Sequence, residues 1–487
     1  MVYMVTITLF YDTLISSMFE FTNTKATIRL IHLLIQSSVL LGTIPLVYGQ
    51  YIDGGNQHTV ILTKEREVWT MGKNEYGELG DSTLTRRIYP VKVKGLPPAV
   101  FVSRGYKHTL AVDENGNVWT WGWNNYGQLA AELPIDYQYP QMVEGIKNAV
   151  AVEGGHWHSL ALLSDGSVMS WGHNFYGELG NGNREHTEIP TQVKQLKDII
   201  KIASVGYFSL ALDKNGNVWA WGSNNYGNLG DGSTKLKTTP VKVKGINNIM
   251  DIATGWHHSM ALGKDGSIWV WGDNPYGQLG IGNYEDLLLP KRLVSLPKAK
   301  KIACGSWHSM MIDIGDNVWC WGRNENGMLG NNTEMNSALP VQLGLGSIKD
   351  IGAGCFQSIA IDKDDNIWVW GENWNGQLGI GNYNRQLTPV ISIINFLNEF
   401  ELNETHLANA HEETKTSLHL LVTPVRGDKS SAENAENVID NEGEIQSANS
   451  KFNLFVRHNK KFLFSFVLNL ILIWKYYHLR RSHLIET

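Results

Sequence analysis

The chain has 487 residues, of which 43% are hydrophobic and 18% are charged, a composition typical of a folded protein rather than a disordered one. Its formal net charge of −6 argues against a nucleic-acid-binding protein, which needs a strongly basic surface. The three cysteines are too few for a disulfide framework and form no cluster with metal-ligand spacing, so no disulfide, metal or cofactor is predicted.

The first 49 residues form an apolar leader. Within residues 25–49, Lys25 and Arg29 precede an apolar run, and Pro45 ends that run shortly before Gly49. This order is the layout of a secretory signal peptide, so it predicts export with cleavage after Gly49, and Met18 is then the expected start of translation. A membrane anchor or an uncleaved apolar tail is the alternative.

From residue 50 the sequence repeats with a period of 50 residues, the last interval being 49. The apolar segment VWTWG at 118–122 recurs in each copy, and its closing glycine marks the period: Gly72, Gly122, Gly172, Gly222, Gly272, Gly322 and Gly371. Each copy also holds three other short runs of β-branched, aromatic and apolar residues bounded by Gly, Asn, Asp or Pro, which are typical of strands. One copy is therefore predicted to be one four-stranded antiparallel sheet.

Hairpin turns and prolines mark the limits of the strands within a copy. Hairpin turns with positive φ at both central residues are predicted at Asn115-Gly116, Asp165-Gly166, Asn215-Gly216 and Asp265-Gly266. The fourth strand of each copy is expected to follow a proline, namely Pro90, Pro140, Pro190, Pro240, Pro290, Pro340 and Pro389.

An isolated sheet of this size cannot bury its faces, whereas seven sheets arranged radially can. The predicted fold is therefore all-β, a seven-bladed β-propeller of four-stranded blades over residues 50–396. Strand alternation places Trp119 and Trp121 on one face, against the neighbouring blade. Because one buried tryptophan removes roughly 150–250 Å² from water, we expect indole rings to hold the blades together.

The C-terminal region departs from the repeat. Residues 397–461 are polar and acidic and predict a disordered spacer. Residues 462–478 contain the apolar run FLFSFVLNLILIW and predict a single helix that either crosses a membrane or lies at its interface.

Recurring polar residues suggest metal sites only superficially. Five histidines occupy one repeat position, with Phe208 and Gln357 in the other two copies: His58, His108, His158, His258 and His308. A metal site needs imidazoles that converge, whereas these are spread one per blade, so we expect each one to satisfy backbone groups near a strand start. The segments DENGN, DKNGN and DKDDN are interpreted as hairpin turns rather than calcium loops.

The candidate binding residues are aromatic and lie just before the histidine position, in the loop between the first and second strands: Tyr106, Trp157, Tyr207, Trp256, Trp307 and Phe356. Loops of one kind open on one face of a propeller, and exposed Trp and Tyr side chains there would form an interface hot spot. The alternative is that these rings pack on neighbouring loops. The sequence contains no phosphate-binding loop and no nucleophile elbow, so no catalytic residues and no enzyme activity are predicted.

Seven approximate copies of G-x-x-H-S-x-A-L followed by W-G-x-N-x-x-G-Q-L-G resemble the regulator of chromosome condensation repeat over residues 50–393. The resemblance implies a seven-bladed propeller. The founding member of that family is a nucleotide exchange factor for the GTPase Ran that binds chromatin, using a wedge inserted in one blade and a basic tail. Here the constant spacing leaves no room for a wedge, and the extension is acidic. The chain is closer in type to secreted relatives that resemble a β-lactamase inhibitor protein and bind proteins through one face.

We therefore expect a non-enzymatic, monomeric binding protein at the cell surface or secreted, associated with a membrane through residues 462–478. It would recognise a protein or a surface glycan through one propeller face and would not bind nucleic acid. The alternative is a cytoplasmic guanine-nucleotide-exchange-like regulator of a small GTPase. A third hypothesis is a propeller hydrolase or lyase whose residues are assembled across loops.

Overall fold

The computed structural model describes residues 49–54, 57–294 and 296–393. The leader up to residue 48, the acidic spacer at 397–461 and the helix at 462–478 lie outside these residues, so those predictions stay predictions. Within the described part of the chain, no helix has the length and apolar character needed to cross a membrane.

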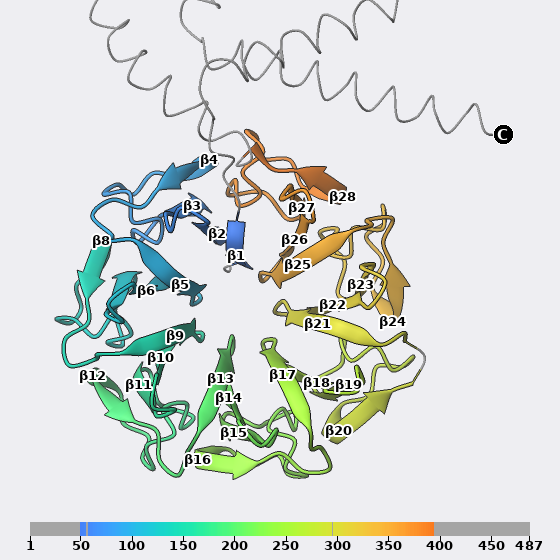
Figure 1. Ribbon diagram of the computed structural model, residues 1–487, viewed down its shortest axis with the longest axis horizontal. Coiled ribbons are helices and arrows are strands. Elements are labelled where there is room, and N and C mark those ends of the chain that lie inside the picture. The colour runs from blue at the N-terminus through green and yellow to red at the C-terminus, as the bar shows by residue number, and fades with distance from the viewer. Residues whose placement is uncertain (1–48, 55–56, 295, 394–487) are drawn as a thin grey trace, which may run out of the picture. The chain divides into compact units, whose positions relative to one another are not determined.

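The described residues form seven sheets, each built from four consecutive antiparallel strands (Figure 1). The first strands surround the centre of the ring: β1 (Gly49–Gly54), β5 (Ala99–Arg104), β9 (Ala149–Gly154), β13 (Ile199–Ser204), β17 (Ile249–Thr254), β21 (Ala299–Cys304) and β25 (Ile348–Ala353). The second strands pack outside them: β2 (His58–Thr63), β6 (His108–Asp113), β10 (His158–Leu163), β14 (Phe208–Asp213), β18 (His258–Gly263), β22 (His308–Asp313) and β26 (Gln357–Asp362).

The third strands carry the tryptophan segments: β3 (Val68–Gly72), β7 (Val118–Gly122), β11 (Val168–Gly172), β15 (Val218–Gly222), β19 (Ile268–Gly272), β23 (Val318–Gly322) and β27 (Ile367–Gly371). The fourth strands form the outer edge: β4 (Arg87–Lys92), β8 (Tyr137–Met142), β12 (Thr187–Gln192), β16 (Lys237–Lys242), β20 (Leu287–Leu293), β24 (Ser337–Gln342) and β28 (Gln386–Ile391). The predicted fold class, a seven-bladed propeller of four-stranded blades, is confirmed.

The hydrophobic core lies between blades, as the strand alternation predicts. In blade 4, Trp221 is fully buried against Leu160 and Leu162 of blade 3, and its Nε1 donates to the Glu178 carbonyl of that blade at 2.7 Å. Trp219 lies on the same side but is only partly buried. Because Val218 and Ala220 point the other way, they pack in the cluster that holds Trp271 of the next blade.

The outer strands and the hairpins differ from the prediction in detail. Each proline lies within its fourth strand rather than before it, as Pro90 does in β4, and an outer edge strand tolerates the missing N–H because that side pairs with nothing. In the β6–β7 hairpin only Gly116 has positive φ, and the Asp113 carboxylate accepts the backbone N–H groups of Asn115 and Asn117. The two-residue turn was therefore wrong, and a longer turn closed by one glycine replaces it.

The ring closes without exchanging a strand between the first and last blades, a point that the sequence left open. Met71 stands where the other blades place a buried tryptophan, and it packs against Ile359 and Val369 of blade 7. Thr59 Oγ1 donates to the Gln377 carbonyl across this junction at 2.7 Å. The junction therefore relies on apolar packing and lacks the indole N–H bond that the other junctions have.

Candidate binding face

Sequential antiparallel strands place alternate connections at opposite ends of a blade. We call the end formed by the first-to-second and third-to-fourth strand connections the loop face, and the opposite end, formed by hairpins and blade-to-blade links, the turn face. All six predicted binding residues lie on the loop face, in first-to-second strand connections. The third-to-fourth connections beside them are long, and their conformation decides what this face presents.

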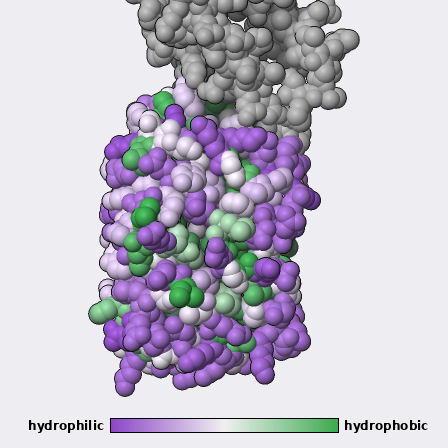
Figure 2. All heavy atoms as spheres, turned by 90° about the vertical axis from the view of Figure 1, so that its left-hand side faces the viewer, coloured by the Kyte–Doolittle hydropathy of each residue, from purple (hydrophilic) through white to green (hydrophobic). Residues whose placement is uncertain are grey.

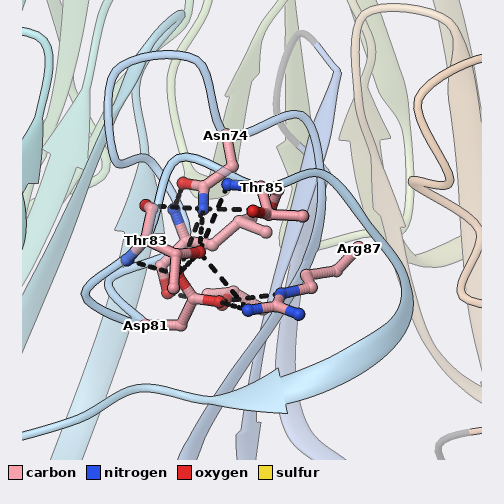
Figure 3. Close-up of polar contacts among 7 residues, drawn as sticks. Asn74, Asp81, Thr83, Thr85 and Arg87 are labelled. Atoms are coloured by element: carbon pink, nitrogen blue, oxygen red, sulfur yellow. Dashed lines mark hydrogen bonds and ion pairs between the residues drawn. The ribbon is translucent and has the colours of Figure 1, made fainter.

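A buried asparagine fixes each long loop, as Figure 3 shows for blade 1. Asn74 Oδ1 accepts the Leu79 N–H at 3.0 Å, and its Nδ2 donates to the carbonyls of Thr83 at 2.9 Å and Thr85 at 3.2 Å. Asp81 accepts the Thr83 N–H and is paired with Arg87, whose Nε lies 2.8 Å from Oδ2. One amide side chain thus joins three points of the loop.

The Oδ1 bond recurs in every blade through equivalent asparagines: Asn74, Asn124, Asn174, Asn224, Asn274, Asn324 and Asn373. Sequence reasoning gave these residues no role, although the asparagine two positions after each strand-ending glycine repeats in all seven copies. A polar residue that recurs beside a buried strand could have been recognised as a loop-fixing group.

We expect Asn224→Ala to lower the free energy of unfolding by about 2–3 kcal/mol, because the buried Leu229 N–H and two carbonyls lose their partner. Urea denaturation measures this change, and amide exchange at Leu229 reports local opening. The neighbouring Asn225 is exposed, so Asn225→Ala serves as the matched control and should change stability little. Equal effects of the two substitutions would contradict the role of the asparagine.

The six predicted aromatic residues occupy two different positions. Tyr106 and Trp256 lie two residues before the histidine position, and Trp157, Tyr207, Trp307 and Phe356 lie one residue before it. All six are partly buried, and most contact other rings of this face. The rings therefore pack on neighbouring loops and also remain partly exposed, and their role as an interface hot spot stays a prediction.

The aromatic side chains two residues before the histidine position contact one another across the ring. Tyr106 of blade 2 meets Trp256 of blade 5 edge to face, with ring centroids 5.7 Å apart. His156 of blade 3 lies between them, 4.2 Å from Tyr106 and 4.9 Å from Trp256. Blades 2 and 5 are not neighbours in the ring (Figure 1), so the contact between Tyr106 and Trp256 has to cross the central region of the loop face.

Aromatic side chains one residue before the histidine position pack against a tyrosine from the long loop of the preceding blade. Trp157 stacks on Tyr126 with centroids 4.9 Å apart, and Tyr207 contacts Tyr176 at 5.2 Å. Trp307 meets Tyr276 edge to face at 5.5 Å. Sequence reasoning missed these tyrosines, although the motif N-x-Y-G repeats in the first five copies. Adjacent blades thereby share one aromatic network, which spreads over the loop face.

The repeated histidines bind the next blade rather than their own backbone. His258 Nε2 lies 3.0 Å from Ser309 Oγ, and that hydroxyl donates to the Gln278 carbonyl of blade 5 at 2.8 Å. A Cβ at Gly255 would overlap the His258 ring, which explains why a glycine stands three residues before this histidine. Burial lowers the pKa of the five repeated histidines to about 3, so they are neutral at pH 7. Among the described residues, no group of three His, Cys, Asp or Glu side chains could hold a metal ion.

A family model for the RCC1-like domain matches residues 42–346 and 199–412, which span most of the chain and all seven blades. The chain belongs to the RCC1-like domain family. This family uses its propeller in general for binding and regulation, and the fold is a protein-interaction fold.

Solved structures of other RCC1-like and related propellers share the fold. Human WBSCR16 is 24% identical with a TM-score of 0.61, and the match covers 67% of this chain and 94% of that one. Prp20p from Saccharomyces cerevisiae is 24% identical with a TM-score of 0.60, covering 71% and 87%. Yeast RCC1 (Prp20) bound to Kap60 is also 24% identical, with a TM-score of 0.61 and 72% and 85% covered. No curated protein matches the sequence.

The RCC1-like propeller exposes its aromatic side chains unevenly. Among the described Phe, Tyr and Trp residues, all of the strongly exposed ones except Tyr139 lie in long loops of the loop face: Phe175, Tyr226, Tyr284, Trp374 and Tyr383. The turn face instead exposes aliphatic side chains at one position of four consecutive first strands: Val100, Val150, Ile200 and Met250. The two ends of the propeller therefore offer different chemistry to a partner.

Proposed function

We propose that this RCC1-like propeller is a non-enzymatic binding protein that recognises a partner protein through its loop face. The clustering of exposed aromatic side chains on that face carries the proposal. Large aromatic rings bury much area with few rotatable bonds, and they dominate the energetics of protein interfaces. Trp374 is 57% exposed and Phe175 is 52% exposed, so both are available for contact.

The other surfaces offer less for such a contact. The side of the propeller drawn in Figure 2 is mainly hydrophilic, with hydrophobic residues scattered among hydrophilic ones. The turn face exposes aliphatic side chains, which contribute less to interface energetics than aromatic rings. The loop face also holds its aromatic residues on loops that buried asparagines fix, which limits the entropy lost on binding.

The proposed location is the cell surface or the extracellular space. The signal-peptide pattern at residues 25–49 supports export, and the apolar segment at 462–478 supports association with a membrane. A surface glycan is the alternative ligand, because aromatic rings also stack on sugars. Fractionation of cells that express the full chain tests the location, and recovery from the cytosol with an intact N-terminus would contradict export.

Regulation of nucleotide exchange on a small GTPase is the second candidate. The structure of Prp20p is described together with its binding properties to Gsp1p and histones, which makes a related activity of this chain a reasonable alternative. All seven described blades have the same four strands, with no added strand that could form an inserted wedge. Accelerated release of a fluorescent guanine nucleotide from purified small GTPases would favour this candidate over the first.

We expect the triple substitution Phe175→Ser, Tyr226→Ser and Trp374→Ser to weaken partner binding at least tenfold while leaving the melting temperature nearly unchanged, because these rings are exposed. Proximity labelling from the full chain, followed by titration of the recovered partner, measures the change. The matched control replaces Val150, Ile200 and Met250 by serine on the turn face. Loss of binding in the control alone would place the interface on the turn face and overturn the proposal.

A further inference from the structure

Cations of the chain itself already lie over rings of the loop face. Lys107 Nζ is 4.4 Å from the Tyr76 centroid and 5.2 Å from that of Trp123. The Arg323 guanidinium is 4.8 Å from the Tyr276 ring. An ammonium or guanidinium within about 6 Å of a ring is attracted by the electron-rich face. Rings of this face are therefore placed so that cationic side chains can reach them, although Trp123 is buried and the two tyrosines are only partly exposed.

The stacked pair of Trp256 and Trp307 has no such cation. Their ring centroids lie 5.7 Å apart at an interplanar angle of 17°. His257 lies beside them, 5.9 Å from Trp307, and burial lowers the pKa of its imidazole to about 4, so it is uncharged at pH 7. In the described part of the chain, no lysine or arginine lies over either indole.

Some long-loop carboxylates of other blades are paired with basic side chains. Asp81 pairs with Arg87 in blade 1, and Asp231 lies 3.1 Å from Lys237 Nζ in blade 4. In blade 6, Glu334 pairs with Arg385 of blade 7. The charge of these acids is therefore largely satisfied within the propeller.

In the long loop of blade 5, all three acids lack a basic partner among the described residues: Asp273, Glu285 and Asp286. Asp286 accepts the Asn274 N–H at 2.8 Å, and the Asp273 N–H donates to the His257 carbonyl at 2.9 Å. The acidic loop is thus bonded to the segment that carries Trp256, and its Tyr276 contacts the Trp307 ring. Burial and, to a lesser extent, the negative charge of Asp286 raise the pKa of Asp273 to about 7. A cation bound nearby would relieve the repulsion between these two carboxylates.

We propose that the blade 5 part of the loop face receives a lysine- or arginine-bearing peptide segment of the partner protein. One cationic side chain would lie over the Trp256–Trp307 pair while the carboxylates of Glu285 and Asp286 balance its charge. Partly exposed indoles that hold no cation and unpaired carboxylates on the same face are complementary to a cationic chain and disfavour an acidic one. This inference rests on the proposed function and adds the chemical class of the partner.

The test uses the full-length chain and a fluorescent peptide of alternating arginine and glycine, with a peptide of alternating glutamate and glycine for comparison. We expect the basic peptide to bind and the acidic peptide not to bind, as measured by fluorescence anisotropy. The double substitution Glu285→Gln and Asp286→Asn should weaken binding about fivefold to tenfold, since each exposed charge contributes modestly. Asparagine keeps the oxygen that accepts the Asn274 N–H, so the loop should remain in place.

The matched control, Glu144→Gln with Asp165→Asn, removes the same charge from the turn face and should change the affinity less than about twofold. An equal effect of both pairs would show a nonspecific charge effect and overturn the inference. Binding of a neutral oligosaccharide at this face in place of the basic peptide would overturn it in favour of a glycan. If binding of the partner requires Phe175, Tyr226 and Trp374 but not Glu285 and Asp286, the loop face is still the interface and only the proposed cationic segment is wrong. If it depends on neither set, the proposed function fails as well.

Discussion

Acidification from pH 7 to about pH 5 is expected to destabilise the propeller strongly, because buried histidines must take up protons on unfolding in this range. Five of them form the repeated bonds between blades, and burial lowers their pKa to about 3: His58, His108, His158, His258 and His308. Burial also lowers the pKa of His156 to about 2 and that of His257 to about 4.

The direction of the effect follows from proton binding. The unfolded chain binds a proton on each histidine below about pH 6.5, whereas the folded chain excludes it until the pH approaches the folded-state pKa. Each such proton lowers the free energy of unfolding by about 1.4 kcal/mol per pH unit in this window. Burial raises the pKa of Glu78 and Asp273 to about 7, and these two groups oppose the effect as they protonate in the folded state. The histidines outnumber them, so acid destabilises the fold.

Urea denaturation at pH 7.5, 6.5 and 5.5 measures this dependence through the change in unfolding free energy. Blade 7 carries Gln357 at the repeated position, where its Nε2 lies 3.4 Å from the His58 carbonyl, so His258→Gln introduces a side chain that the fold already uses. This substitution should reduce the slope of the unfolding free energy against pH by about 1.4 kcal/mol per pH unit below pH 6. Ser309→Ala removes the hydroxyl partner of His258 but no titrating group, so it should lower stability without reducing the slope. Identical slopes in both variants would contradict the role of the histidines.

The fold was predictable because its main signals are local and repeated. Alternation along VWAWG places Trp219 and Trp221 on one side of β15, and a period of 50 residues counts the blades directly. The hairpins were located correctly at Asn115-Gly116, but the turn type was not, because Asp113 and its two backbone bonds decide it. A dipeptide signal gives the place of a turn more reliably than its geometry.

The candidate site was predictable only as a set of loops on one face. Tyr106 and Trp256 meet although 150 positions separate them in sequence, because the ring brings non-adjacent blades together at its centre. The pairing of Trp157 with Tyr126 depends on how one blade is rotated against the next, which no single repeat encodes. The substitution of Met71 for a tryptophan was visible in the sequence, but its position at the ring junction became clear only from the closed ring.

Trp221→Ala is expected to lower the free energy of unfolding by about 3–5 kcal/mol, because it empties the contact between blades 3 and 4. The Trp221 side chain is fully buried, and it packs against Leu160, Leu162 and Val193. Its loss also leaves the Glu178 carbonyl without the indole N–H that donates to it at 2.7 Å. A cavity and an unsatisfied buried acceptor therefore act together.

Trp219→Ala is the matched control, since it removes the same side chain from the same strand. Trp219 is partly exposed, and its Nε1 donates to Asp213 in its own blade at 3.2 Å, so its replacement should cost only about 1–2 kcal/mol. Thermal and urea denaturation of both variants measure the difference. An unchanged melt for Trp221→Ala, or an equal cost for both tryptophans, would contradict the conclusion that buried indoles hold adjacent blades together. Because Met71 fills the equivalent place at the ring junction without an indole N–H, Met71→Ala should cost less than Trp221→Ala in the same experiment.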